Sequence, residues 1–221
     1  MNQQKEIQID EAKKLQLKEL ILNINTIGID IDGTIADTIG AALLEIRNRF
    51  GDIMEYSQWK TWNPHQIPEL QAQGLTTIDH TIQLFYGILR EDGNQIVGSI
   101  SDSVEGITRL QSFGKELIAL SGRMEDSHRY TTLWLNHNFS GIFQKVLLTD
   151  HDTPRQIPKY ELAQVHGIGL MIEDNAQYAI DLSTHGIPTI LIDAPWNIND
   201  DLSEYPNIFR VKNWKEIISL I

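Results

Sequence analysis

The chain has 221 residues, of which 41 % are hydrophobic and 22 % are charged, close to the average for globular proteins. This composition excludes a disordered chain, and the length allows one domain with an insertion or two small domains. Eighteen basic residues against thirty acidic ones give a net charge of −12. Such a charge disfavours binding to nucleic-acid polymers and to anionic membranes.

Cysteine is absent, which excludes disulfide bonds, thiolate zinc sites and cysteine nucleophiles. There is no run of about 18 apolar residues that could span a membrane. Residues 1–10 have charged and amide side chains where a signal peptide needs an apolar core. We therefore expect a soluble, cytoplasmic protein.

In chain order, residues 4–22 mix charged residues with leucine and isoleucine in a partly helical pattern, which predicts a helix packed on the outside of a domain. Residues 27–31 form a short, largely apolar run. An Asp-Gly-Thr tripeptide at 32–34 follows, which is a turn and capping signal before a helical pattern over 39–50. This segment is predicted as strand, loop and helix.

Residues 51–98 have a different character, with several tryptophans and prolines, one helical stretch over 78–89 and no convincing apolar strand. From residue 104 onward, strands and helices alternate. The predicted strands are 116–120, 145–148, 170–172 and 189–192, and the predicted helices are 104–113, 126–138, 159–166 and 176–184. This alternation predicts right-handed βαβ units and a parallel sheet.

We therefore predict an α/β fold in which a Rossmann-like parallel sheet has helices on both faces and a small helical cap is inserted after the first strand. The predicted parts are an N-terminal helical extension at 1–25, a core at 26–50 and 99–221, and the cap at 51–98.

Acidic residues follow two predicted strands, and the carboxyl ends of parallel strands meet at one edge of a sheet. Asp30 and Asp32 lie two residues apart, which on an extended strand places them on the same face. Glu173 and Asp174 close the fourth strand. Carboxylates this close cannot all ionise in a partly buried pocket unless a cation compensates them. Oxygen ligands favour a hard metal, and Mg²⁺ also leaves positions for water and a phosphate.

Other residues predicted at the same edge suit an anionic substrate. Ser121 offers a hydroxyl donor, and Gly122 and Arg123 offer backbone N–H groups near a helix N-terminus. Lys159 supplies a positive charge. Each residue alone has an ordinary structural explanation as a cap, a turn or a solvated side chain, but the ordered set favours a phosphate site.

The ordered set resembles the four motifs of the haloacid dehalogenase-like (HAD) phosphohydrolase superfamily over about residues 26–193. The matching segments are Asp30-Ile31-Asp32-Gly33-Thr34, Leu120-Ser121-Gly122-Arg123, Lys159 and Ile172-Glu173-Asp174-Asn175. The resemblance implies that Asp30 is the nucleophile that takes the phosphoryl group. It also implies that Asp32 is first the general acid for the leaving oxygen and then the base for water.

The resemblance implies the remaining roles as well. Mg²⁺ would be bound by Asp174, the carboxylate of Asp30 and the main-chain carbonyl of Asp32. Ser121 and Lys159 would hold the transferring phosphoryl oxygens, with Gly122 beside them. The supporting residues would be Thr34, Arg123 and Glu173, and Thr34 could instead simply cap the following helix. True dehalogenases of the superfamily lack the second aspartate and need no metal, so Asp32 favours a phosphatase.

The predicted cap lies where the superfamily places a lid that excludes water and selects the leaving group. Tyr56, Trp59 and Trp62 offer flat faces for a nucleobase, although such residues also form the core of a small cap. The short cap, the Glu-Asp-Asn end of the fourth strand and the sequence Asp-Ala-Pro-Trp-Asn at 193–197 resemble the 5′(3′)-deoxyribonucleotidase family and its bacterial relatives.

We therefore predict a Mg²⁺-dependent phosphatase that hydrolyses a phosphate monoester, a nucleoside or deoxyribonucleoside monophosphate, through an aspartyl phosphate. A sugar-phosphate phosphatase or a phosphomutase on the same core is an alternative, as is a non-catalytic binding protein. A phospho-accepting receiver domain is disfavoured, because the third strand ends in Leu-Thr-Asp at 148–150 with no second motif around it.

Overall fold

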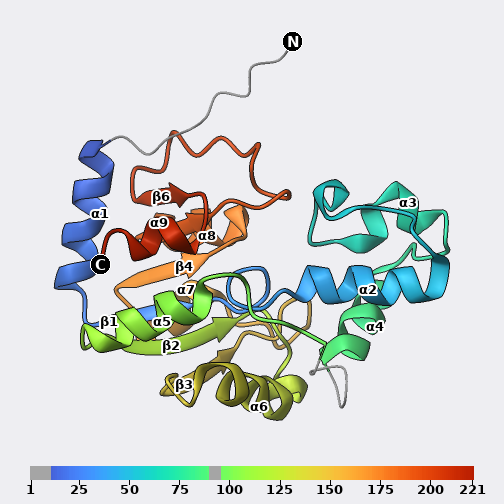
Figure 1. The fold of residues 1–221 in the computed structure, drawn as a ribbon, viewed down its shortest axis with the longest axis horizontal. Helices are drawn as coiled ribbons and strands as arrows, with labels where there is room; N and C mark the ends of the chain where they lie inside the picture. Colours follow the sequence, from blue (N-terminus) through green and yellow to red (C-terminus); the bar gives the residue numbers. More distant parts are fainter. Residues whose placement is uncertain (1–10, 90–95) are drawn as a thin grey trace.

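The computed structural model describes residues 11–89 and 96–221. Figure 1 shows a larger part built around a sheet and a smaller helical part beside it. Within the described residues the sheet has six parallel strands in the order β3-β2-β1-β4-β5-β6. They are β1 (Thr26–Ile29), β2 (Glu116–Ser121), β3 (Lys145–Leu148), β4 (Leu170–Glu173), β5 (Thr189–Ile192) and β6 (Ile208–Val211).

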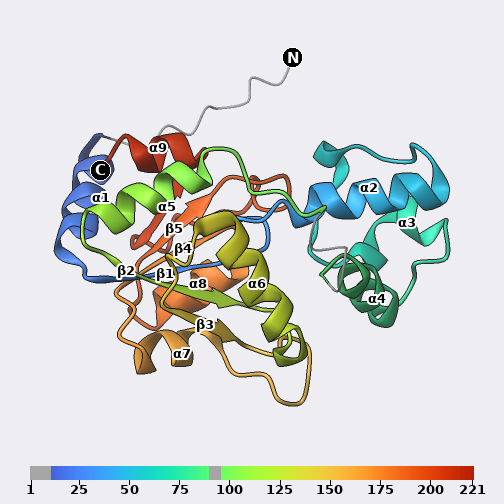
Figure 2. The same ribbon diagram turned by 60° about the horizontal axis from the view of Figure 1, so that its bottom comes forward.

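Helices cover both faces of this sheet (Figures 1 and 2). They are α1 (Glu11–Asn23), α5 (Ser103–Ser112), α6 (His128–Phe139), α7 (Lys159–Val165), α8 (Ala176–Thr184) and α9 (Trp214–Ile218). Successive side chains of a strand point to opposite faces. In β2, Leu117 and Ala119 pack in the core cluster that includes residues of α1, α5, α6 and α9, whereas Ile118 and Leu120 pack with α7 and α8. The predicted α/β class, with helices on both faces of a parallel sheet, is confirmed.

Two details of the core differ from the sequence prediction. β1 ends at Ile29 and not at residue 31, so Asp30 and Asp32 lie in the loop after the strand. β6 and α9 were not predicted, and both are short elements at the end of the chain. The described part of the predicted 4–22 helix is α1, and residues 4–10 lie outside the described residues.

The smaller part consists of α2 (Thr38–Phe50), α3 (Pro68–Gln71), α4 (Ile78–Leu89) and short 3-10 turns at 56–58 and 64–66. In both ribbon views it lies to one side of the sheet, where α2 packs against α4 (Figures 1 and 2). Residues 38–50 were predicted as part of the core, and the helix that they form, α2, packs against α4. Trp59 and Leu70, both without exposed surface, fill the interior of this part.

Two chain segments connect the smaller part to the core, and they are hydrogen-bonded to each other. The Asp37 N–H donates to the Gly98 carbonyl at 2.8 Å, and the Ile100 N–H donates to the Ile35 carbonyl at 2.9 Å. The chain therefore leaves the core and returns to it at one place. We call this pair of segments, 35–37 and 98–100, the double crossing.

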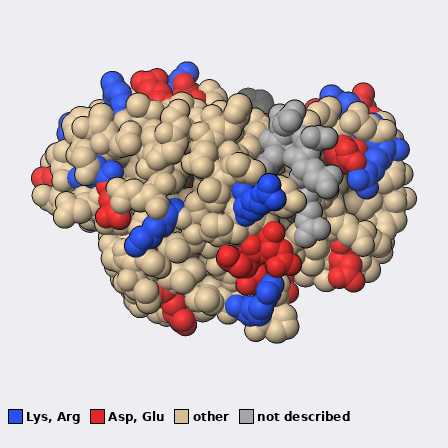
Figure 3. All heavy atoms as spheres, turned by 90° about the horizontal axis from the view of Figure 1, so that it is seen from below, with Lys and Arg blue, Asp and Glu red and all other residues tan. Residues whose placement is uncertain are grey.

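Acidic and basic side chains are interspersed on the face shown in Figure 3, with several acidic residues gathered below the middle of the view. The described residues on that face therefore form no continuous basic surface. Among the described helices, none is both long enough and apolar enough to cross a bilayer.

Candidate active site

A cavity of about 380 Å³ lies at the carboxyl edge of the sheet, against the smaller part. Its sheet side is polar and is lined by most of the residues predicted from the sequence: Asp30, Asp32, Ser121, Gly122, Arg123, Glu173 and Asp174. Its other side is largely apolar and includes Trp62 and, from α4, Ile78, Ile82, Phe85 and Leu89. The structure therefore brings three of the four predicted motifs to one cavity wall, and Lys159 lies behind that wall.

The loop after β1 turns sharply at Gly33, where φ is +79°, a conformation that glycine adopts without steric cost. There is also no room for a side chain, because a Cβ atom on Gly33 would lie 2.3 Å from Asp174 Oδ2. The Gly33 N–H donates to the Ala36 carbonyl at 2.9 Å. Glycine at this position therefore lets the loop pack directly against Asp174.

Lys159 is the first residue of α7, and 1 % of its surface is exposed. Its Nζ donates to Asp30 Oδ1 at 2.6 Å and to Glu173 Oε2 at 3.0 Å. Burial favours the neutral amine, but Asp30 and Glu173 outweigh burial and raise the pKa of Lys159. Lys159 is therefore charged, and its single positive charge is shared between two carboxylates at the back of the cavity.

Asp32 forms a bidentate ion pair with Arg123. Arg123 Nε donates to Asp32 Oδ2 at 2.8 Å, and Arg123 Nη2 donates to Asp32 Oδ1 at 2.7 Å. Thr38 also donates a hydrogen bond to Asp32. Burial would raise the pKa of Asp32, but the Arg123 guanidinium and these hydrogen bonds together lower it. Asp32 is therefore ionised in this structure. Arg123 was predicted to offer its backbone N–H and to be a supporting residue, but this ion pair was not predicted.

Asp30 and Asp174 lie on either side of the Thr34 hydroxyl. Thr34 Oγ1 is 3.3 Å from Asp30 Oδ2 and 3.2 Å from Asp174 Oδ1. A hydroxyl has one proton, so it donates to only one of these oxygens at a time. Burial raises the pKa of Asp30 and of Asp174, and for Asp174 the charge of Asp30 adds to the effect. For both of these carboxylates to be ionised, they need a further positive partner.

The charge balance of the cluster fits a divalent cation. Among the described residues, Arg123 pairs with Asp32, and Lys159 pairs with Asp30 and Glu173, whereas Asp174 has no cationic partner. When all four carboxylates are ionised, these two cations leave two negative charges. Ligand oxygens of Asp30, Glu173 and Asp174 lie within 4.8 Å of one another. Oxygen ligands alone suit Mg²⁺. Both oxygens of Glu173 accept from the charged Lys159. Lys159 donates to one oxygen of Asp30, and the donors to Asp174 are uncharged.

Ser121 and Gly122 lie at the end of β2. The Ser121 hydroxyl donates to Asp32 Oδ2 at 3.4 Å and accepts from the Arg123 N–H at 3.3 Å. A Cβ atom on Gly122 would lie 3.0 Å from the hydroxyl of Tyr178. That hydroxyl is buried without a hydrogen-bond partner among the described residues. Tyr178 lines the cavity and was missed by the sequence analysis, because a tyrosine in the first turn of α8 gives no signal of its own.

The three aromatic residues predicted for substrate contact lie in different places. Trp62 lines the cavity. Trp59 is completely buried and packs against Phe85, with ring centroids 6.4 Å apart. Tyr56 is 39 % exposed and lines a separate groove along α2. Of these three, Trp62 is therefore the residue that a bound molecule could contact.

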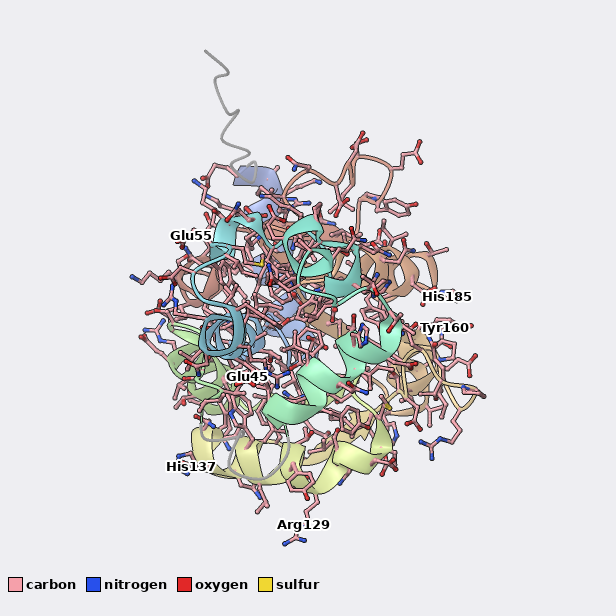
Figure 4. The ribbon with its side chains drawn as sticks, turned by 90° about the vertical axis from the view of Figure 1, so that its right-hand side faces the viewer. Glu45, Glu55, Arg129, His137, Tyr160 and His185 are labelled. Carbon is pink, nitrogen blue, oxygen red and sulfur yellow. The ribbon has the colours of Figure 1, made fainter. Side chains whose placement is uncertain are left out.

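Three histidines, His128, His137 and His151, follow β2 and β3 in the chain, and they lie in different surroundings. His137 points outward from α6, as does Arg129 (Figure 4). His128 lies 3.3 Å from the Val146 carbonyl. His151 differs, because it lines the cavity and its Nε2 lies 3.4 Å from Asp152 Oδ1. Its position just after β3 was the signal available in the sequence.

No protein-family model and no curated protein matches the chain. Solved structures do match. A haloacid dehalogenase-like family hydrolase from Streptococcus pneumoniae has a TM-score of 0.62 and 16 % identity over 89 % of this chain and 97 % of its own. A predicted phosphoglycolate phosphatase from Haemophilus somnus has a TM-score of 0.61 and 16 % identity, over 89 % of this chain and 97 % of its own. A dehalogenase has a TM-score of 0.59 and 15 % identity, over 90 % of this chain and 97 % of its own.

These structures include a dehalogenase as well as a phosphatase. The shared architecture therefore does not choose between the two reactions, and that choice depends on the side chains in the cavity. At identities this low, the similarity concerns the fold. The chain has the fold of the haloacid dehalogenase-like hydrolases.

Proposed function

We propose that this chain is a Mg²⁺-dependent phosphatase that hydrolyses a nucleoside or deoxyribonucleoside monophosphate through an aspartyl phosphate on Asp30. The main support is the buried acidic cluster, in which Asp30 and Asp174 face each other across Thr34 at a cavity wall. Two uncompensated negative charges in this cluster match one divalent cation. The metal would be held by Asp30, Asp174 and the main-chain carbonyl of Asp32.

In the first step, a carboxylate oxygen of Asp30 attacks phosphorus, and the bond from phosphorus to the leaving oxygen breaks as Asp32 gives that oxygen a proton. In the second step, water attacks phosphorus and Asp32 takes a proton from it. The bond from phosphorus to Asp30 then breaks, which releases inorganic phosphate and restores the carboxylate. When bound, Mg²⁺ supplies the positive charge that lets a carboxylate approach a dianionic phosphate.

Asp32 must hold a proton in the first step, although Arg123 keeps it ionised in the structure described above. Arg123 also lines the cavity, so a substrate phosphate would compete with Asp32 for the guanidinium. Loss of the ion pair would remove the main influence that lowers the pKa of Asp32. Arg123 and Ser121 are therefore proposed to bind phosphoryl oxygens. Lys159, which lies behind Asp30, is proposed to bind phosphoryl oxygens as well.

The apolar side of the cavity is proposed to receive the leaving group. Ile78, Ile82, Phe85 and Leu89 recur along one face of α4, and Trp62 lies beside them. Among the described residues, the smaller part contributes no lysine or arginine to the lining. This wall favours a flat, uncharged group such as a nucleobase, and it disfavours a leaving group with its own carboxylate.

The experiment that tests this function is a measurement of phosphate release from nucleoside monophosphates, sugar phosphates and phosphoglycolate, with Mg²⁺ and with EDTA. We expect Mg²⁺-dependent release that is fastest from nucleoside monophosphates. Faster release from sugar phosphates would retain the reaction and reject the nucleotide. Migration of phosphate within a sugar phosphate would indicate a mutase. The absence of release from the whole panel would contradict the phosphatase assignment.

A single substitution in α4 tests the role of the apolar wall. Ile82→Arg places a guanidinium among apolar cavity residues, where it can pair with a carboxylate on the leaving group. We expect kcat/KM for a nucleoside monophosphate to fall about tenfold or more, because the charge disrupts an apolar contact surface. The value for phosphoglycolate should fall less or rise. Ile82→Leu is the matched control, and a parallel loss for both substrates in Ile82→Arg would reject this wall as the specificity element.

A further inference from the structure

The loop after β5 is hydrogen-bonded to the backbone of Asp174. Asn197, which is 1 % exposed, donates from its side-chain amide to the Asp174 carbonyl at 2.6 Å and to the Ile192 carbonyl at 2.7 Å. Its amide oxygen accepts from the Ala194 N–H at 3.1 Å and from Arg210 Nη1 at 3.0 Å. Every hydrogen-bonding group of this amide lies within bonding distance of a partner, so the loop is held firmly beside the end of β4.

Trp196, the neighbour of Asn197, contacts the Asp174 side chain. Its indole Nε1 donates to Asp174 Oδ2 at 2.7 Å, while Thr34 lies at the other oxygen, Oδ1. Hydrogen bonds to a charged acceptor are short and strong. Donors from two separate segments therefore fix the orientation of this carboxylate, and each acts on a different oxygen.

The indole cannot serve as a metal ligand, because it has a donor and no acceptor. It also does not line the cavity, so it does not touch a bound substrate. A Cβ atom on Gly33 would lie 2.9 Å from Trp196 Cζ2 and 2.3 Å from Asp174 Oδ2. The loop after β1 is therefore packed against both partners of this hydrogen bond, which limits the movement of either one.

The ring of Trp196 also contacts the smaller part. It lies edge to face with Trp62, with centroids 5.1 Å apart, and 6.0 Å from the ring of Tyr56. Trp62 in turn packs against Phe85 of α4 at 6.1 Å. Rings at these separations attract one another and add to the stability that burial gives. These contacts pack the indole against the smaller part, separately from its hydrogen bond to Asp174.

We infer that Trp196 is a positioning residue whose indole N–H orients Asp174 for a divalent cation. Residues that hydrogen-bond a ligating carboxylate set its direction, and their loss typically weakens metal binding by about 10- to 100-fold. The inference rests on the proposed Mg²⁺ site and adds a determinant of its affinity.

The test compares two variants of the full chain by titration calorimetry with Mg²⁺ alone, without substrate. Trp196→Phe keeps an aromatic ring and removes the N–H, and we expect the Kd for Mg²⁺ to rise about tenfold. Trp62→Leu removes the nearest ring contact and leaves the N–H, and we expect a change of less than about threefold. Phosphate release by Trp196→Phe should recover at high Mg²⁺, because the substitution weakens only the affinity for Mg²⁺. A misfolded chain would not recover.

Two results would overturn the inference. One is an unchanged Kd in Trp196→Phe. The other is an equal rise in Trp62→Leu, which would make general packing the determinant in place of the hydrogen bond. If the unaltered chain binds no Mg²⁺, the proposed metal site itself fails, and the role of Trp196 fails with it. If the unaltered chain binds Mg²⁺ and the Kd of Trp196→Phe is unchanged, only the role of Trp196 fails and the metal site stands.

Discussion

Asp30→Asn is expected to abolish phosphate release while the protein stays folded. The side chain keeps its size and an oxygen that can accept from Lys159, but it loses the charge that attacks phosphorus. Removal of a nucleophile commonly costs a factor of about 10³ or more in kcat. The measurement is the rate of phosphate release at saturating Mg²⁺ with the best substrate of the panel.

The melting temperature of the same variant provides the control. Burial raises the pKa of Asp30, so its ionised form costs stability as the pH rises above the value at which Asp30 titrates in the unfolded chain. A permanently neutral Asn avoids this cost near pH 7. We therefore expect the metal-free variant to melt at the same temperature as the unaltered chain or higher. Normal phosphate release from such a stable variant would reject Asp30 as the nucleophile.

Asp174→Asn is expected to raise the Kd for Mg²⁺ by about 100-fold or more, beyond the range for a residue that only orients a ligand. The change removes one of the two carboxylates that face each other across Thr34. In the unaltered chain, Mg²⁺ at about 100 times its Kd should stabilise the fold by about 2.7 kcal/mol. The variant should lose most of this stabilisation, and thermal melting with and without Mg²⁺ measures it.

Glu173→Gln is the matched comparison for Asp174→Asn. Each variant neutralises one of two buried carboxylates that are neighbours in the sequence. Glu173 differs from Asp174 because it accepts both of its hydrogen bonds from Lys159. We expect Glu173→Gln to change the Kd for Mg²⁺ much less than Asp174→Asn does. The reverse order would assign the ligand role to Glu173.

The strand pattern allowed the position of the acidic cluster to be predicted. Strands that alternate with helices form a parallel sheet, and this places the residues after β1, β2 and β4 at one edge. Asp30, Ser121 and Asp174 meet there for that reason. Short apolar runs bounded by turns were enough for this prediction, because such runs, when they alternate with helical patterns, fit buried parallel strands.

Side-chain pairing within the cluster could not be predicted. The ion pair between Arg123 and Asp32 depends on the direction of a long side chain, and Trp196 reaches Asp174 from a loop 22 residues away. Trp62 could not be separated from Trp59 either, because both lie in the irregular segment between two 3-10 turns, which has no hydrophobic period. Three-dimensional packing decides these contacts.

The double crossing gives the smaller part a pivot. Because the segments at 35–37 and 98–100 are hydrogen-bonded side by side, we expect rotation about that pair to be the easiest large motion of the smaller part. Thr38, which donates to Asp32, follows the first segment directly, whereas α4 forms the apolar wall of the cavity. A swing that opens the apolar wall widely would displace Thr38 only slightly. The cavity could therefore open to the leaving group without a change in the positions of the reacting carboxylates.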